Sequence, residues 1–451
     1  MKKLIFSITT TFIFSMGVFA QETPATLSFR EAIEIGLKNN INVKRQQNQL
    51  EFAEHQNLNS KSQYLPSLSA TAQGSRTEGQ QINSVTGSGE NITSDRLFAS
   101  VDANYTLFNG LNRYYSAKAS NTNVKSQIHA VERSKQDVIS TVTSQYLQVL
   151  LDAELLQIAK ENLETQNLLL TQTKSFVDVG TRAKPDEYAQ LAIVKNAELS
   201  VIRAEGTYRN DKSILSQTLQ LDELTDFEVV SPEWSVEDLM NMNYSLEELF
   251  DTAIQNRDDL QQSEMSTRSN ELLMKSNNAG YLPNIGVFAS YGSQYFAVKG
   301  NENAESFGRQ FYDLNPFLQY GFRLTIPIFD RFQTYSNKSQ AKVNYLNSQN
   351  NYENLKKTVK IDVQRSFQNY ENAIAAYNAS LTQLESSKLS YELEKERYEL
   401  GISGLVDYNQ ANQRYVQAKG DIAQATYTLL FQDILMQYAI GTLSVEDIPS
   451  N

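Results

Sequence analysis

The sequence predicts an α plus transmembrane β fold, in which an internal duplication supplies two long helical hairpins and two β-hairpins. Three observations support this fold class. Similar residues recur at a constant spacing in the two halves of the chain. Each half contains roughly 70 consecutive positions without glycine or proline. A segment that alternates between apolar and polar residues precedes each of these runs, as expected for a β-strand with two different faces.

The N-terminus has the features of an export signal. Lys2 and Lys3 precede an apolar run from Leu4 to Val18, and a small residue, Ala20, follows shortly after. As a helix this run is too short to span a bilayer comfortably, which takes about 20 apolar residues. We therefore expect residues 1–20 to be a signal peptide that is removed on export. No later segment is apolar for long enough to span a membrane as a helix, so any membrane insertion would have to use strands.

Two constant offsets relate the halves of the chain. An offset of 217 aligns the first third of each half, and an offset of 221 aligns the remainder, which indicates a duplication. The aligned pairs include Ser28 with Ser245, Glu31 with Glu248, Tyr64-Leu65-Pro66 with Tyr281-Leu282-Pro283, Phe108 with Phe329, Gly180 with Gly401, and Asp186 with Asp407.

The duplication predicts a first repeat over 21–220, a linker over 221–243 and a second repeat over 244–451. Each repeat is expected to contain a short helix, a β-hairpin and a long helical hairpin, in that order. The short helices are predicted near 28–62 and 245–279, the β-hairpins at 67–107 and 284–328, and the helical hairpins at 111–221 and 330–440, followed by a C-terminal tail.

An apolar or tyrosine residue recurs every seven positions inside both long runs, which is typical of helices that supercoil with a neighbour. A glycine interrupts each run near residue 180 or 401, and a second helical stretch follows it, so each run is expected to turn back on itself. The heptad positions are Val142, Val149, Leu156, Leu163, Leu170 and Val177 in the first half, and Val363, Tyr370, Tyr377, Leu384, Tyr391 and Tyr398 in the second.

Four strands are predicted, at 67–75, 97–107, 284–292 and 318–328, with exposed loops at 76–96 and 293–316. An open sheet is unstable in lipid, because each unpaired edge group costs several kcal/mol. Barrels begin at about eight strands, so several copies would have to share one barrel, with Asp102, Asn104 and Arg323 facing its lumen. The alternative is a water-soluble sandwich whose strands pack against the helices.

Composition excludes several classes of function. The chain has no cysteine and only two histidines, His55 and His129, which removes disulfides, thiolate sites and most histidine chemistry. Its 40 basic and 52 acidic residues give a net charge of −12, which disfavours nucleic acid as a partner. The sequence therefore predicts neither an enzyme nor a protein with a metal or other cofactor.

The ordered motifs resemble those of the TolC-type outer-membrane efflux proteins over essentially the whole mature chain. They are the duplication, Tyr64-Leu65-Pro66 and Tyr281-Leu282-Pro283 before the strands, Leu107-Phe108-Asn109-Gly110 and Ile328-Phe329-Asp330 after them, the hairpin tips Val179-Gly180-Thr181 and 400–407, and the closing Ala439-Ile440-Gly441-Thr442-Leu443.

The resemblance implies a homotrimer whose twelve-stranded β-barrel lies in the outer membrane of a Gram-negative bacterium. It also implies a long periplasmic α-barrel that meets a periplasmic adaptor protein and an inner-membrane transporter, and conducts drugs or other small molecules to the outside. Two alternatives remain open, a conduit for type I protein secretion and a non-channel coiled-coil scaffold in the periplasm.

By the same resemblance, the periplasmic gate would consist of Asp186, Asp407, Gln410 and Tyr398. Three copies of Asp407 would form an acidic ring, and the Tyr398 hydroxyl would bond Asp186 of the neighbouring hairpin. Alternatively, the two aspartates are helix N-caps and Tyr398 is a coiled-coil core residue.

The adaptor-docking tips implied by the resemblance are Gly180, Thr181 and Arg182 in the first hairpin, and Gly401, Ile402 and Ser403 in the second. The alternative for these positions is ordinary turn chemistry, in which glycine supplies a positive φ.

Overall fold

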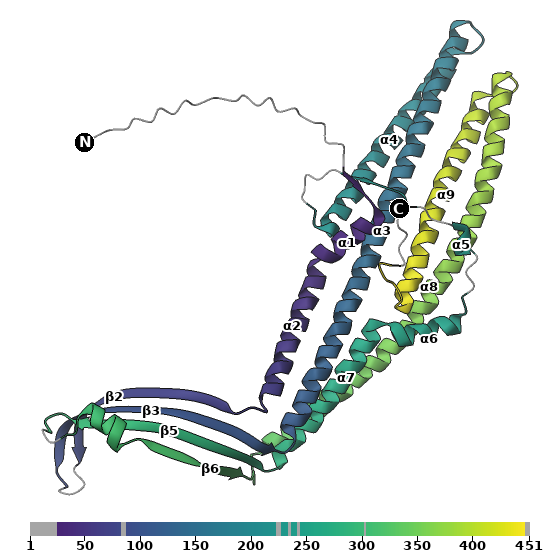
Figure 1. Ribbon diagram of the computed structural model, residues 1–451. Coiled ribbons are helices and arrows are strands. Elements are labelled where there is room, and N and C mark those ends of the chain that lie inside the picture. Colours follow the sequence, from purple (N-terminus) through teal and green to yellow (C-terminus); the bar gives the residue numbers. More distant parts are fainter. Residues whose placement is uncertain are drawn as a thin grey trace, which may run out of the picture.

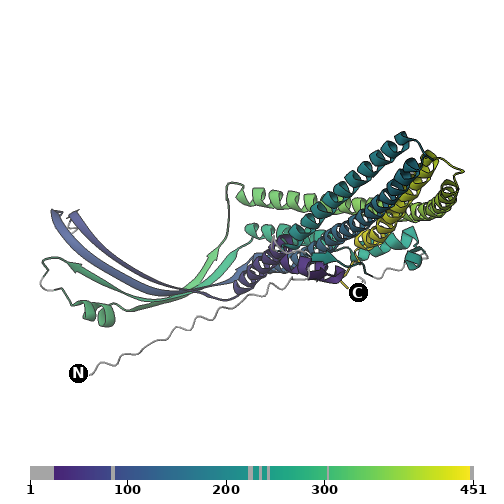
Figure 2. The same cartoon turned by 90° about the horizontal axis from the view of Figure 1, so that it is seen from above.

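The computed structural model describes residues 25–82, 87–221, 227–232, 236–240, 244–301 and 304–446. The predicted signal peptide at 1–20 lies outside these residues, as do parts of the 221–243 linker and the end of the C-terminal tail. Two tall helical hairpins stand side by side, and a curved sheet extends from the end of the helical part that lies away from the hairpin turns (Figure 1). The view from above shows the same elongated arrangement, with the sheet at one end (Figure 2).

Both halves of the chain build the same set of helices. Helices α3 and α8 each have 67 residues, which corresponds to about 100 Å at 1.5 Å per residue, and α4 and α9 each have 36. The helices of the first half are α1 (Phe29–Asn39), α2 (Ile41–Ser62), α3 (Asn112–Asp178) and α4 (Lys184–Leu219). Those of the second are α6 (Leu246–Asn256), α7 (Asp258–Ser276), α8 (Gln333–Glu399) and α9 (Leu405–Ile440).

The single short helix expected in each half is in fact two helices. Asn40 leaves the helical region between α1 and α2, and its side chain accepts hydrogen bonds from the backbone N–H groups of Asn42 and Val43. Arg257 makes the corresponding break between α6 and α7. The positions of glycine and proline in the sequence did not reveal these breaks, because neither residue stands at Asn40 or Arg257.

Residues with positive φ repeat at the offset of 221. Leu111 (φ 68°) corresponds to Phe332 (φ 63°), and Gln220 (φ 54°) corresponds to Gly441 (φ 78°). The first pair precedes the long helices α3 and α8, and the second pair follows the ends of α4 and α9. A left-handed backbone conformation costs free energy for any residue except glycine. Three of these four residues are not glycine, so the same costly conformation at equivalent positions indicates that both halves share the same backbone turns.

One antiparallel sheet joins the two halves. Its order is β2 (Ser67–Ile82), β3 (Gly89–Asn109), β5 (Asn284–Val298) and β6 (Phe317–Thr325). The predicted loop at 76–96 was wrong in extent, because β2 and β3 pair up to Ile82 and Gly89. The loop predicted at 293–316 likewise contains the end of β5 and a short π-helix, η2 (Arg309–Leu314). Cross-strand hydrogen bonding continues through these polar residues although they lack an apolar face.

The sheet has one apolar face and one polar face. Val101, Tyr291 and Leu318 lie in register on the apolar face, and all three are more than half exposed. Asp102, Ser290 and Gln319 lie in register on the polar face, where the Ser290 hydroxyl donates to Asp102 over 2.6 Å. The sheet extends away from the helices instead of packing on them, which rules out the sandwich alternative (Figure 1).

Seven of the twelve heptad residues are buried in the helical part, and the other five are half-buried. Val142, Val149, Val363 and Tyr370 are at most 2% exposed. No helix in the described part of the chain is both long and apolar enough to cross a membrane.

Two tyrosines hold the described parts of the linker against the helices. The Tyr146 hydroxyl lies 2.8 Å from the Leu27 carbonyl and accepts a hydrogen bond from the Val230 N–H over 3.0 Å. It thereby fastens the parallel pair of β1 (Ala25–Leu27) and β4 (Phe227–Val229). The Tyr370 hydroxyl donates to the carbonyl of Leu239 in α5 (Val236–Met240).

Candidate gate and docking tips

Each helical hairpin turns through the same glycine-centred motif. Gly180 has φ 81° and Gly401 has φ 72°, values that residues with a Cβ rarely adopt. The following residues, Thr181 and Ile402, donate their N–H groups back to the carbonyls of Phe176 and Arg397 over 2.9 and 2.8 Å. This is the Schellman pattern of helix termination, so the turn-chemistry interpretation holds for both glycines.

Asp186 and Asp407 occupy equivalent positions, but they are not N-caps. Each is the third residue of its helix, and the N-caps are Ala183 and Gly404, which make no side-chain capping bond. A carboxylate in the first turn still interacts favourably with the helix dipole, by about 0.3–1 kcal/mol. The helical role of both aspartates is therefore electrostatic.

The exposed face of α9 carries two of the predicted gate residues. Asp407 and Gln410 are both exposed and lie three positions apart, so they share one side of the helix. Asp186 is half-buried on α4, in the other hairpin. The Asp407 carboxylate and the Gln410 amide are therefore both accessible on one exposed face of α9.

Tyr398 is buried and does not bond Asp186 within the chain. It is 3% exposed, its ring stacks on that of Tyr408 at 5.3 Å, and its hydroxyl has no hydrogen-bond partner among the described residues. Leu169 of α3 and Leu405 of α9 complete this cluster. The coiled-coil core interpretation therefore describes its packing, and the predicted bond is absent within the described part of the chain.

Arg182, and not Asp186, contacts Tyr398 between the two hairpins. Its guanidinium lies 5.1 Å from the centre of the Tyr398 ring, which joins the tip of the first hairpin to α8. A cation–π contact of this kind is worth about 0.5–2 kcal/mol, depending on its desolvation.

Buried amides, which the sequence analysis missed, connect the hairpins below the tips. The Gln190 amide donates to the Gln166 side chain over 2.7 Å and receives a bond from Asn409 over 3.1 Å. Asn412 donates to Asn162 over 3.0 Å. Gln166 and Gln190 are at most 2% exposed, so leaving them unpaired would cost about 1–3 kcal/mol each. The sequence signal for these contacts is the presence of polar residues three or four positions apart on the long helices, a spacing that places both side chains on one helix face.

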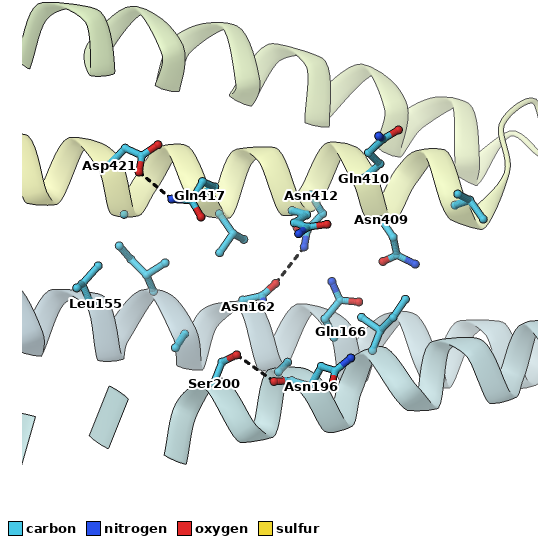
Figure 3. A pocket seen from close by; sticks show the side chains of 18 of the residues that line it. Leu155, Asn162, Gln166, Asn196, Ser200, Asn409, Gln410, Asn412, Gln417 and Asp421 are labelled. Carbon is cyan, nitrogen blue, oxygen red and sulfur yellow. Dashed lines mark hydrogen bonds between the residues drawn. The ribbon is translucent and has the colours of Figure 1, made fainter. Parts of the chain in front are cut away.

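A groove of about 910 Å³ lies beside these amides, between α3, α4 and α9 (Figure 3). Its lining is mainly amide and aliphatic, with Leu155, Asn196 and Gln417 as examples. Beside it, Lys419 pairs with Glu161 over 2.8 Å and holds the pKa of Glu161 below its usual value. The groove therefore follows the seam between the hairpins.

The predicted docking residues differ in accessibility. Ile402 is 66% exposed and Thr181 is also exposed, but Ser403 is only 9% exposed and cannot offer its side chain to a partner. Three further residues of the tip motifs, which were not among the predicted docking residues, have exposed apolar side chains, namely Val179, Leu400 and Val406. Apolar residues concentrated on a protruding tip indicate an interaction surface.

The family assignment agrees with this architecture. The sequence model of the outer membrane efflux protein family matches residues 32–219 and 249–442. The chain belongs to this family. Its members are outer-membrane channels, so the protein is located in the outer membrane of a Gram-negative bacterium and is not an enzyme. The scaffold alternative is therefore wrong.

Individual relatives are distant in sequence but similar in fold. TolC of Salmonella enteritidis is 23% identical over 368 residues, which cover 79% of this chain and 71% of that protein. The match to TolC of Escherichia coli is 26% identical and spans 38% of this chain but only 34% of that protein. The CmeC outer membrane channel of Campylobacter jejuni superimposes with a TM-score of 0.80 at 19% identity, covering 98% of this chain and 94% of that one.

The open state of the MtrE channel of Neisseria gonorrhoeae gives a TM-score of 0.74, also at 19% identity, covering 92% of this chain and 91% of that one. Such likenesses establish the fold.

Proposed function

We propose that three copies of this chain close a twelve-stranded barrel and form the outer-membrane exit of an efflux system for small molecules. The observation that supports this most strongly is the sheet itself. Its outer strands, β2 and β6, each pair on one side only within the described chain, and the middle of one face is apolar, with Val101, Tyr291 and Leu318 more than half exposed. Four strands cannot close a barrel, whereas three such sheets supply twelve.

In this proposal the two repeats, 21–220 and 244–451, contribute equivalent parts of the assembly. The polar face with Asp102, Asn104 and Arg323 lines the water-filled lumen, and the helical hairpins continue the conduit on the periplasmic side. An adaptor protein and an inner-membrane transporter complete the path. The free energy for transport comes from the transporter, and the channel itself stays closed when nothing is being transported.

The gate is proposed to lie at the hairpin tips. Threefold repetition would bring three Asp407 carboxylates and three Gln410 amides around one axis, where clustered negative charge attracts cations and repels anions. The contact of Arg182 with Tyr398 and the buried amides would keep the two hairpins together while the tip is closed.

Planar-bilayer recording tests the conduit and its gate together. Purified protein is expected to give small cation-selective conductance steps. The double variant Asp186→Ala with Asp407→Ala should raise the resting conductance several-fold or reduce the preference for cations. Conversely, Gln410→Asp adds a carboxylate beside Asp407 and should increase that preference.

Glu164→Ala is the matched control for the gate, because it removes an exposed carboxylate from α3 well before the turn. It should leave both quantities unchanged. If the double variant behaves like this control, the two aspartates are not gate residues, and if the native protein never conducts, the conduit proposal fails.

Docking of the adaptor is proposed to use the exposed apolar residues at the tips. Leu400→Asp and Val406→Asp place a charge on side chains that are 75% and 78% exposed. We expect cells that depend on this channel to become several-fold more sensitive to an exported compound, while conductance in the planar bilayer stays native. Leu400→Ile and Val406→Ile keep the surface apolar and should retain resistance. If the aspartate variants keep native resistance, the adaptor does not dock on these apolar residues.

A further inference from the structure

The segment between β5 and β6 carries an aromatic cluster that the conduit proposal does not use. Four aromatic residues, Tyr295, Phe307, Phe311 and Tyr312, have ring centres 5.2–6.4 Å from one another in successive contacts. Phe311 and Tyr312 belong to η2, the short green helix beside the strand ends farthest from the helical hairpins (Figure 1).

Side-chain amides fasten this segment to the edge of β5. Strand β6 begins at Phe317, opposite Gly292, so it does not cover the backbone of β5 beyond that point. There Gln310 both donates to the Phe296 carbonyl over 3.0 Å and accepts from its N–H over 3.2 Å. Asn315 donates to the Gln294 carbonyl over 2.8 Å. These bonds replace those of a missing strand and give η2 a defined position.

The cluster lies on the apolar face of the sheet. Ser293 and Tyr295 continue the alternation of Tyr291 and therefore point to the same side as that apolar residue. The Ser293 hydroxyl donates to the Phe311 carbonyl over 2.6 Å, and the Tyr295 ring contacts Phe307. The first contact places η2, and the second places Phe307 just before it, over the face that the proposed barrel turns outward.

The height of the cluster along the strands matches the edge of a hydrocarbon layer. Ile285, opposite Leu324, lies near the helical end of the apolar face, and Tyr295 is 295 − 285 = 10 residues further along β5. Ten residues correspond to about 33 Å along a strand. At the usual tilt of roughly 40°, the projected height is about 25 Å, the thickness of the apolar band of such barrels.

We propose that this aromatic cluster rests in the interfacial layer of the outer leaflet, with membrane lipid as its partner. Tyr312 is 69% exposed and Leu314 is 54% exposed, so both side chains are accessible to a partner. Tyrosine suits this depth because its ring is apolar and its hydroxyl reaches water. The inference rests on the proposed barrel and adds a lipid-contacting collar that is built from a loop and not from strands.

Tryptophan quenching by brominated lipid tests the contact. The chain has one tryptophan, Trp234, so Trp234→Phe gives a background without this fluorophore. In that background, Tyr312→Trp is placed in vesicles of phosphatidylcholine with or without brominated acyl chains. We expect brominated lipid to reduce its emission at least twofold, and acrylamide in the water to quench it weakly.

Two further variants separate the inference from the proposed function. Tyr320→Trp reports on the apolar face within the sheet, and Phe98→Trp reports on the opposite face near the same height as the cluster. Quenching of Tyr320→Trp and Tyr312→Trp, but not Phe98→Trp, supports the collar. If Tyr320→Trp alone is quenched, the cluster faces solvent or a neighbouring subunit and the inference is overturned. If neither is quenched, the barrel proposal fails with it.

Discussion

Arg257→Met is expected to lower the free energy of unfolding by about 2–4 kcal/mol, because it removes one partner of a largely buried ion pair. The Arg257 side chain is 5% exposed, and its guanidinium bonds both carboxylate oxygens of Asp259 over 2.6 and 3.0 Å. It also donates to the Ala439 carbonyl over 3.1 Å and lies 3.8 Å from Asp362. One side chain therefore connects α6, α7, α8 and α9.

The electrostatics of Asp259 explain the size of this effect. Burial alone would raise the pKa of its carboxyl group, but the two bonds from Arg257 bring the pKa below its usual value. Without the guanidinium, the carboxylate would keep the desolvation cost and lose its compensation.

Urea unfolding followed by circular dichroism in detergent measures the loss. Arg257→Lys keeps the charge but not the two-pronged geometry, so it should fall between the native protein and Arg257→Met. Lys195→Met breaks the exposed pair with Glu198 and should change stability by less than about 1 kcal/mol. Equal midpoints for Arg257→Met and Lys195→Met would show that the buried network contributes little.

Arg257 also shows why the duplication predicts the fold better than it predicts individual contacts. At the offset of 217 it corresponds to Asn40, and both residues separate two short helices. Asn40 stabilises its break locally, by capping α2, whereas Arg257 uses residues that are remote in the sequence. The arrangement of helices and breaks follows from spacing and periodicity in the sequence. The partners of a long side chain depend instead on how the helices pack in the folded protein.

The same distinction applies to the candidate gate. The duplication placed Asp186 and Asp407 at equivalent positions, and the structure puts each in the first turn of its helix. The environment of Tyr398 was not predictable from its heptad position, because its stacking on Tyr408 and the lack of a hydrogen-bond partner for its hydroxyl among the described residues arise only when α8 and α9 pack together. Likewise, Gln190 reads as an ordinary polar residue until α9 brings Asn409 to it.

Asp152→Asn is expected to raise the stability of the protein at pH 7.5 by about 1–2 kcal/mol, on the basis that each unit of pKa shift corresponds to about 1.4 kcal/mol. Asp152 of α3 is 4% exposed, and its carboxyl group accepts a hydrogen bond from Gln148 over 3.0 Å. Burial, together with the adjacent carboxyl group of Asp211 on α4, raises the pKa of Asp152 to about 6. The expected gain is smaller than the full shift would give, because the asparagine amide is still a buried polar group that carries a desolvation cost.

The direction of the pH dependence follows from the raised pKa. Between about pH 6 and pH 4 the folded protein binds a proton at Asp152, whereas the unfolded chain, with an ordinary aspartate pKa near 3.8, does not. Acidification through this range therefore stabilises the native protein through this group, and a rise to neutral pH removes that contribution. The unfolding midpoint of Asp152→Asn should accordingly exceed that of the native protein at pH 7.5 and approach it at pH 4.5.

Two variants decide whether the pair of carboxyl groups is the cause. Asp211→Asn removes the neighbouring charge and should reproduce part of the gain at pH 7.5, since Asp152 then ionises more easily. Glu164→Gln neutralises an exposed carboxylate on the same helix and should change neither the midpoint nor its pH dependence. A native pH profile in Asp152→Asn would mean that the proton taken up below pH 6 binds elsewhere, and that α3 and α4 meet at this point without an electrostatic cost.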